Sequence, residues 1–148
     1  MVKPAPPAAE RVVVAARVRV RYAETDAMGV VYYGTYLSYF EDGRAHYLRE
    51  RGLPYSEMER QGIFMPVAEA HCRYLAPARF EDVLTVETWV GDAGRARVRF
   101  DYVVRRGDDI LAEGYTVHAA RGRDGRPVRI PDAWAEKLGF PQPENDEV

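Results

Sequence analysis

The chain has 148 residues, 47% of them hydrophobic and 30% charged, which suits one globular domain that buries about 70% of the surface its unfolded chain exposes. Its formal net charge of -2 at pH 7 does not favour nucleic acid or an anionic membrane as a partner. The single Cys72 excludes an internal disulfide, and no apolar run approaches the roughly 18 residues of a membrane span, so we expect a cytoplasmic protein.

Both ends of the chain have the composition of tails. Residues 1–10 (MVKPAPPAAE) are rich in proline and alanine and lack the apolar core of a signal peptide, so we expect a disordered N-terminal tail. Residues 141–148 (PQPENDEV) are expected to form an acidic C-terminal tail. The segment 11–140 between them contains no internal repeat and no linker, which predicts a single domain.

The first predicted element is a strand at residues 12–22, VVVAARVRVRY. Apolar and arginine side chains alternate along it with the period of two that is typical of a half-buried strand. A short acidic turn follows, in which Asp26 precedes Gly29, the residue expected to close the turn.

The next segment, TYLSYFEDGRAHYLRER at residues 35–51, predicts a long helix. Its apolar face consists of Tyr36, Leu37, Phe40, Tyr47 and Leu48. Thr35 is the expected N-cap, and Gly52 followed by Pro54 provides the stop. Glycine inside a helix costs about 1 kcal/mol relative to alanine, so we expect Gly43 to pack closely against a strand.

Four further strands are predicted after the helix. Alternating or β-rich runs place them at 64–75, 82–90, 95–105 and 110–121, the first being the weakest. Turn-forming residues predict hairpins at 91–94 and 106–109. The segment PDAWAEKLG at 131–139 predicts a short last helix.

This order of elements predicts an α+β domain in which a curved antiparallel sheet of about five strands wraps one long central helix. The helix fills one face of the sheet, but the edge strands stay open. Pairing with a second copy would cover such an edge, so we expect at least a homodimer.

Asp26 is the first candidate functional residue. A solvated aspartate in an ordinary turn is the simpler interpretation of this position. The alternative is a carboxylate aimed at a pocket formed by Val30, Val31, Tyr32 and Tyr33. Such walls would desolvate the carboxylate and make it a better base or nucleophile than it is in water.

The start of the predicted helix supplies the second candidate group. The first backbone N–H groups of a helix lack partners within the helix and carry the positive end of its dipole. The N–H groups of Tyr33, Gly34 and Thr35 are therefore candidates to polarise a carbonyl oxygen and stabilise an oxyanion. A carboxylate beside such donors suits hydrolysis of an activated acyl group and needs no metal.

The histidines and the cysteine are scattered. His46, His71 and His118 lack the spacing of a metal site. A contact on one helix face is the simpler interpretation of His46, four residues after Asp42. Cys72 is expected to be a small buried hydrophobe.

Other motifs for nucleophilic or phosphate chemistry are weak. The sequence contains no nucleophile elbow and no phosphate-binding loop, and neither Ser38 nor Ser56 has the context of a nucleophile. The arginine-rich stretches at 95–99 and 121–129 are either solvated faces or contacts for a phosphate-bearing cofactor.

The stretch RVRYAETDAMGVVYYGTYLSYFEDGR, residues 19–44, resembles the signature of the 4-hydroxybenzoyl-CoA thioesterase family of hotdog-fold acyl-CoA thioesterases. The resemblance extends more loosely through PARFEDVLTVET to DGRPVRIP, and so covers the chain from about residue 15 to 135. It implies a hotdog domain over 11–140 and an acyl-CoA substrate. No cofactor is then required, because coenzyme A is part of the substrate.

The resemblance also implies roles for individual residues. The aspartate of the family motif is the catalytic carboxylate, acting as nucleophile or as general base on water, and it matches Asp26. The residue seven positions later gives its backbone N–H to the thioester carbonyl and matches Tyr33. Many relatives have His there and Asn two residues later, where this chain has Tyr33 and Thr35. The backbone role survives this change, whereas a role for an imidazole does not.

Further contacts follow from the same resemblance. The expected substrate contacts are Val30, Val31, Gly34 and Thr35. The family binds the CoA nucleotide with basic surface residues, for which the candidates are Arg95, Arg97, Arg126 and Arg129. Independently of the resemblance, the aromatic side chains near the motif either suit an aromatic or short acyl group or simply pack the helix; they are Tyr32, Tyr33, Tyr36 and Phe40.

Two alternatives stay open at this point. A hotdog dehydratase or hydratase would use a His with an acidic partner, and this chain offers Tyr33 at the matching position. A non-catalytic acyl-CoA binding module would use the same cleft without turnover. We expect a homodimer, and further pairing of dimers would give a homotetramer.

Overall fold

The computed structural model describes residues 2–4 and 11–140. The predicted tails therefore fall largely outside the described residues, although Val2–Pro4 forms a short strand, β1. The remaining elements, in chain order, are β2 (Val14–Arg19), the 3-10 turn η2 (Tyr22–Glu24), α1 (Thr35–Glu50), α2 (Tyr55–Arg60), β3 (Val67–Tyr74), β4 (Val83–Gly94), β5 (Arg97–Arg106), β6 (Asp109–Ala119) and α3 (Asp132–Leu138). Among the described residues, no helix has the length and apolar content needed to cross a membrane.

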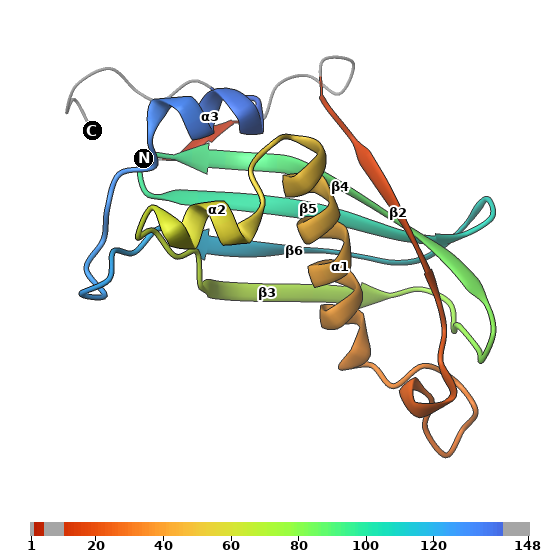
Figure 1. Cartoon of the computed structure of the whole chain (residues 1–148). Coiled ribbons are helices and arrows are strands. Elements are labelled where there is room, and N and C mark those ends of the chain that lie inside the picture. Colours follow the sequence, from red (N-terminus) through yellow and green to blue (C-terminus); the bar gives the residue numbers. More distant parts are fainter. Residues whose placement is uncertain (1, 5–10, 141–148) are drawn as a thin grey trace.

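The sheet is antiparallel throughout, with the strand order β1-β4-β5-β6-β3. The long strand β4 has two partners along one edge, because β2 pairs with its residues 83–88 and β1 with its residues 92–94. Helix α1 crosses one face of the sheet, and β3 forms the opposite edge (Figure 1). One long helix against a curved antiparallel sheet is the architecture that the sequence predicts.

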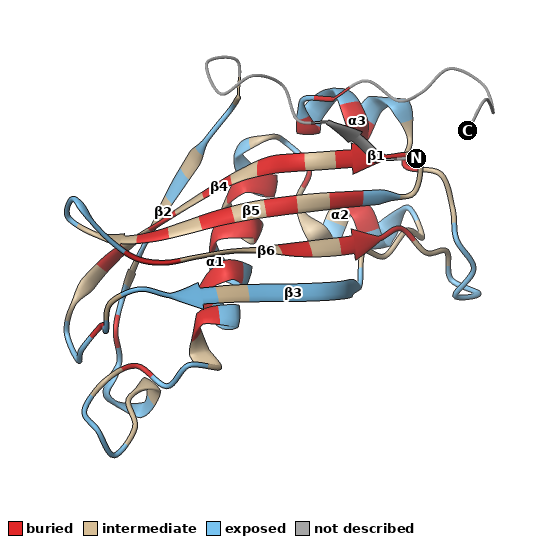
Figure 2. Cartoon of the chain, turned by 180° about the vertical axis from the view of Figure 1, so that it is seen from behind, coloured by how far each residue is buried: buried red, intermediate tan, exposed pale blue. Residues whose placement is uncertain are grey.

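The core lies between α1 and the sheet. Along β4 and β5, buried and half-buried side chains alternate, as a strand with one covered face requires (Figure 2). Phe40 of α1 stacks on Tyr102 of β5, with ring centroids 4.3 Å apart and planes 5° from parallel. Gly43 packs against Val86 and Thr88 of β4, which confirms the close helix–strand contact expected there.

Two details of the predicted helix are wrong. Leu37 is 44% exposed and does not join the apolar face, where Tyr39 is buried instead. The N-cap is Gly34 rather than Thr35, which is the first helical residue, and no side chain caps the helix. At the other end of α1, His46 lies 3.9 Å from the Glu50 carboxylate; no hydrogen bond or ion pair with Asp42 is found among the described residues.

The hairpin predicted at 91–94 joins β4 and β5 as expected, but its turn lies later in the chain, because β4 continues to Gly94 and β5 begins at Arg97. The ladder between β4 and β5 has a bulge between Val90 and Asp92. A Cβ on Gly91 would lie 2.0 Å from Oδ2 of Asp101, so glycine leaves room for that carboxylate rather than forming a turn. The hairpin at 106–109 is confirmed by the pairing of Arg106 with Asp109.

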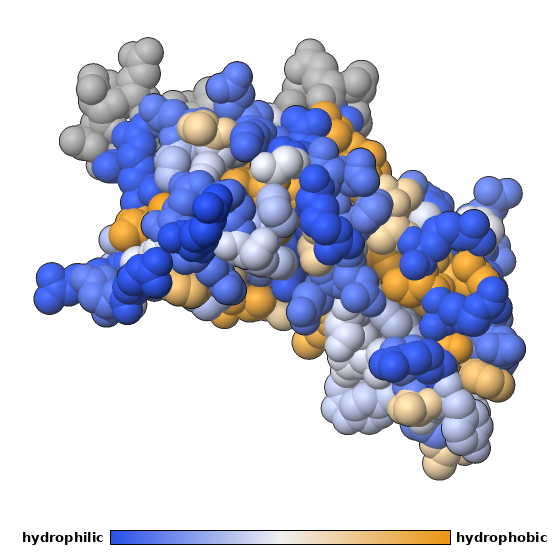
Figure 3. All heavy atoms as spheres, in the orientation of Figure 1, coloured by the Kyte–Doolittle hydropathy of each residue, from blue (hydrophilic) through white to orange (hydrophobic). Residues whose placement is uncertain are grey.

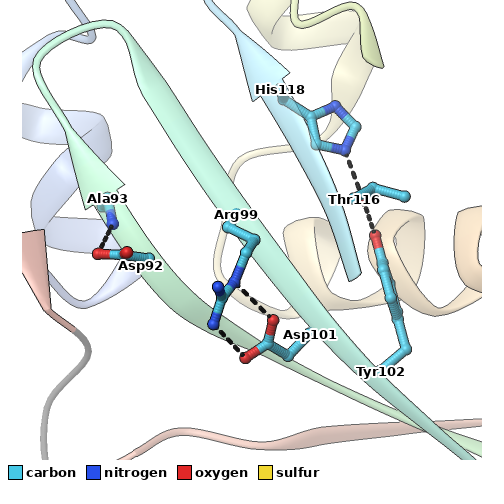
Figure 4. Close-up of polar contacts among 7 residues, drawn as sticks. All are labelled: Asp92, Ala93, Arg99, Asp101, Tyr102, Thr116 and His118. Atoms are coloured by element: carbon cyan, nitrogen blue, oxygen red, sulfur yellow. Dashed lines mark hydrogen bonds and ion pairs between the residues drawn. The ribbon is translucent and has the colours of Figure 1, made fainter. Parts of the chain in front are cut away.

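A chain of polar side chains runs through the core from α1 to β6. Arg44, 8% exposed, donates from Nε to Tyr55 and from Nη1 to Tyr102 at 3.0 Å. The Tyr102 and Thr116 hydroxyls are 2.6 Å apart, and Thr116 Oγ1 is 2.8 Å from Nε2 of His118 (Figure 4). Burial first, and then the Arg44 charge, lowers the pKa of His118 to about 4, so the imidazole is neutral.

Candidate active site

Asp26 begins a tight turn between η2 and α1. Its N–H donates to the Val30 carbonyl at 2.9 Å, and the Gly29 N–H donates to the Asp26 carbonyl at 2.9 Å. Gly29 has a φ of 79°, a conformation that favours glycine. The Oδ1 atom of Asp26 accepts the Met28 N–H at 2.9 Å, so the carboxylate is held by its own turn. Its Oδ2 has no hydrogen-bond partner among the described residues, which leaves one carboxylate oxygen available.

The segment that leads into α1 has two available N–H donors. The Thr35 N–H donates to the Tyr32 carbonyl at 2.9 Å, so it is occupied and the three donors expected from the sequence become two. The N–H groups of Tyr33 and Gly34 have no acceptor in the part of the chain that the structure describes. These two groups lie where α1 begins and where its dipole is positive.

The residues expected to wall a pocket around Asp26 lie in different places. Val31 is 5% exposed and belongs to the hydrophobic core, whereas Tyr32 and Tyr33 are 48% and 63% exposed. The two tyrosine rings contact each other, with centroids 4.6 Å apart. The Tyr33 phenol chiefly, and the Asp26 carboxylate to a smaller extent, raise the pKa of Tyr32. A single chain thus provides an exposed aromatic surface beside Asp26.

Tyr74 connects the end of β3 to this surface. Its hydroxyl donates to the Tyr33 carbonyl at 2.9 Å, and its ring meets the Tyr36 ring edge-on with centroids 5.2 Å apart. The Tyr33 carbonyl and the Gly34 N–H belong to the same planar peptide, so the Tyr74 hydroxyl orients the Gly34 donor. Burial and the Cys72 thiol raise the pKa of Tyr74 to about 12, which keeps the phenol protonated.

A model of the thioesterase-like superfamily matches residues 20–138. The chain belongs to this superfamily. It is 35% identical to the acyl-CoA thioesterase YbgC of Haemophilus influenzae over 117 residues, which covers 77% of this chain and 85% of that protein. The DHNA-CoA thioesterase structure from Staphylococcus aureus superposes with a TM-score of 0.81 at 31% identity, covering 84% of this chain and 87% of that one. A hypothetical protein from Thermus thermophilus, TT1821, has the same TM-score of 0.81 at 40% identity, covering 84% of this chain and 95% of that one.

These similarities confirm two of the expectations. The fold is the hotdog fold, and this member of the thioesterase-like superfamily is a thioester hydrolase. The similar proteins include a thioesterase named for another acyl-CoA, so the match is shown for the superfamily and not for the 4-hydroxybenzoyl-CoA thioesterases alone.

The four arginines expected to bind CoA lie at the other end of this thioesterase-like domain. Arg97 begins β5, and the Arg95 carbonyl accepts the Ile130 N–H at 2.7 Å, beside Arg129. Arg126 belongs to the loop that follows β6, which projects at the left of Figure 1, where Figure 3 shows strongly hydrophilic surface. The Asp26 turn lies at the right of Figure 1, so one chain does not bring the arginines to Asp26.

The remaining candidates, Cys72 and His71, make packing contacts. Cys72 is half-buried in β3 and packs against the core, as a small hydrophobe would. His71 stacks on Tyr115, with ring centroids 5.2 Å apart. Within the described ranges, no three His, Cys, Asp or Glu side chains are grouped as a metal site would require.

Three contacts at this site are not predicted by the sequence. Two of them are the contacts of Tyr74 with Tyr33 and with Tyr36, described above. The third is the hydrogen bond of 2.9 Å between the side chains of Glu24 and Tyr39. Tyr74 lies 41 residues from Tyr33, and nothing in its strand pattern sets it apart from other alternating residues. Tyr39 occupies a helical position whose burial depends on the exact rotation of α1.

Proposed function

We propose that the protein hydrolyses an acyl-CoA thioester to a free acid and CoA, with Asp26 as the catalytic carboxylate. The observation that carries this proposal is the position of a carboxylate oxygen and two N–H donors on one short stretch, from Asp26 to Gly34; none of the three has a hydrogen-bond partner among the described residues. A thioester carbonyl oxygen would accept hydrogen bonds from Tyr33 and Gly34, which stabilises the negative charge that develops on it. Donors of this kind typically contribute about 10² to 10³ in rate.

Asp26 then acts in one of two ways. As a nucleophile, Oδ2 attacks the carbonyl carbon, the C–S bond breaks, CoA leaves as a thiolate, and water cleaves the resulting anhydride. As a general base, Asp26 takes a proton from a water molecule that attacks the same carbon, and the C–S bond again breaks to release CoA thiolate. In both routes Met28 holds Oδ1, which leaves Oδ2 to react.

We propose further that the working unit is a homodimer paired along β3. This strand pairs only with β6 among the described strands, and nearly all its residues are exposed (Figure 2). An exposed edge of this length is a template for another strand. Antiparallel pairing of two β3 strands about a two-fold axis would complete one sheet across both copies.

Such a dimer would unite the two halves of the site. β3 begins opposite His118, near the arginine end of the sheet, and ends at Tyr74, which contacts Tyr33. An antiparallel partner would therefore place its arginine end next to this chain's Asp26 turn. The CoA nucleotide would then contact basic residues of the second copy, while the acyl group meets the tyrosines of the first.

The test is thiol release from acetyl-, butyryl-, octanoyl-, palmitoyl- and benzoyl-CoA by the wild type and by Asp26→Asn. The matched control is Asp108→Asn, because Asp108 is also an aspartate in a turn, the exposed one between β5 and β6. We expect turnover to be lost in Asp26→Asn and kept in Asp108→Asn. Full turnover in Asp26→Asn would exclude Asp26 from the reaction, and binding of acyl-CoA without any turnover by the folded wild type would favour a binding module.

A further inference from the structure

Glu24 makes a contact that the proposed reaction does not use directly. It is the last residue of η2 and lies two residues before Asp26. Its Oε1 accepts the Tyr39 hydroxyl at 2.9 Å and the Arg21 backbone N–H at 2.9 Å, while Oε2 lies 3.3 Å from the Arg21 guanidinium. Tyr39 itself is 2% exposed and belongs to the second turn of α1.

The backbone of Glu24 makes a second connection to the same region. Its carbonyl accepts the Tyr32 N–H at 2.9 Å. Glu24 is thus joined to the segment that carries the Tyr33 and Gly34 donors through its main chain, and to the body of α1 through its side chain. Asp26 follows it by two residues, a path of about 7 Å in an extended chain.

The hydrogen bond between Tyr39 and Glu24 has a defined donor and is a strong one. Burial, followed by the hydrogen bond to Glu24, raises the pKa of Tyr39, so the phenol keeps its proton and donates. A hydrogen bond to a charged carboxylate is about twice as strong as one between neutral groups. The Glu24 side chain is only 14% exposed, so solvent competes little for its oxygens.

We propose that Glu24 and Tyr39 are positioning residues, which hold the Asp26 carboxylate in register with the Tyr33 and Gly34 N–H groups. This inference rests on the proposed thioester hydrolysis. A displacement of about 1 Å between reacting groups can cost 10²-fold in rate. Loss of the hydrogen bond between Glu24 and Tyr39 therefore lowers kcat even though neither side chain touches the substrate. Substrate binding, which depends on other surfaces, is unaffected.

The test compares the steady-state kinetics of Tyr39→Phe and Tyr47→Phe. Both residues are buried tyrosines of α1, at 2% and 1% exposure, and the Tyr47 hydroxyl donates to the Leu138 carbonyl at 3.3 Å, far from Asp26. Each variant loses one phenolic hydrogen bond and keeps its ring. Positioning predicts that Tyr39→Phe lowers kcat about 10- to 100-fold with KM within twofold of the wild type, whereas Tyr47→Phe leaves kcat unchanged.

Two Glu24 variants complete the experiment. Glu24→Gln keeps a carbonyl oxygen for the Tyr39 hydroxyl and should retain most of kcat, whereas Glu24→Ala should match Tyr39→Phe. Because both changes remove the same bond, the double variant Glu24→Ala/Tyr39→Phe should be no slower than either single variant. Wild-type kcat in Tyr39→Phe, or equal losses in Tyr39→Phe and Tyr47→Phe, would overturn the inference.

The Asp26→Asn variant separates this inference from the proposed function. If Asp26→Asn is inactive while Tyr39→Phe is fully active, the proposed hydrolysis stands and only the positioning role fails. If Asp26→Asn is as active as the wild type, or if the wild type is inactive, the proposed function fails and the positioning role fails with it.

Discussion

Gly43 of α1 lies so close to Thr88 of β4 that a Cβ on residue 43 would be 2.5 Å from Thr88 Oγ1. The Val86 side chain is on the same side, with Cγ1 2.7 Å from that point. Both strand residues are fully buried, so neither side chain can move away from a Cβ at position 43. The close approach of the helix to the sheet therefore depends on glycine at this position.

We expect Gly43→Ala to lower the free energy of unfolding by about 1–3 kcal/mol, the usual cost of overpacking a filled core. Alanine is the better helix former by about 1 kcal/mol, so the sign of the change shows which effect dominates. Urea unfolding gives the measurement, and Ser38→Ala, at an exposed position of the same helix, is the control. A more stable Gly43→Ala protein would contradict the close contact.

His118 predicts how stability depends on pH. Its neutral ring is bonded on both sides, to Thr116 at Nε2 and to the Met65 carbonyl at Nδ1. The pKa of about 4 in the folded protein lies below the value of about 6.5 in an unfolded chain, so the unfolded state binds the proton first. The stabilisation is complete above about pH 6.5 and is lost as the pH falls toward 4, by up to about 3 kcal/mol.

The measurement is the free energy of unfolding at several pH values between 4 and 7. The His118→Gln variant removes the titrating ring and should show a shallower pH dependence across this range. Equal slopes in the wild type and His118→Gln would exclude His118 as the cause.

Tyr74 should affect turnover through the Gly34 donor. Tyr74→Phe removes the hydroxyl that holds the Tyr33 carbonyl, so the peptide that carries the Gly34 N–H is less well oriented. We expect kcat to fall by roughly 3- to 10-fold, a part of the effect of losing an oxyanion donor outright. Tyr115→Phe, at a half-buried tyrosine of β6, should leave kcat unchanged; an unaffected Tyr74→Phe enzyme would show that the peptide is oriented without this bond.

The proposed dimer can be tested with the same substitution on two strands. Ala70→Lys places a charge on the exposed edge strand β3, near the middle of the proposed strand pair, where two copies would repel each other. Ala15→Lys places the same charge at an exposed position of β2. Light scattering after gel filtration should show a monomer for Ala70→Lys and a dimer for Ala15→Lys. A dimer in both would mean that another surface pairs.

The sequence predicts those parts of the fold that depend on local pattern. Apolar residues alternate along β4 and β5, whereas Phe40 and Tyr47 have the spacing of a helix. Because the period of a strand differs from that of a helix, each pattern identifies its element. The structural role of a glycine is harder to predict from the sequence. Gly91 looks like part of a turn but lies in a bulge that makes room for Asp101, a residue of the next strand. A glycine that makes room for a side chain distant in the sequence cannot be recognised from its sequence neighbours.

The same distinction applies to the candidate site. Asp26, Tyr33 and Gly34 are close in sequence, so a turn followed by a helix start is enough to predict that they lie together. Tyr74 and the partners of Glu24 come from other elements, and their contacts exist only once α1 and β3 are packed. The sequence offers the four arginines as candidates, but their place at the end of the sheet far from Asp26 follows from strand direction, which residue patterns do not contain.

The two outer edges of the sheet differ in what they offer to a neighbour. On one side, β2 exposes Arg17 and Arg19, whose like charges oppose pairing with a second copy of the strand. On the other side, β3 exposes Val67, Ala68 and Ala70 together with Glu69 and Arg73, whose charges have opposite signs. A sheet with one receptive edge closes when two copies meet about a two-fold axis, and nothing is left to extend. In the proposed dimer, the asymmetry that permits pairing along β3 would also stop growth into fibres. The exposed β3 edge would then carry a risk of aggregation only in the monomer.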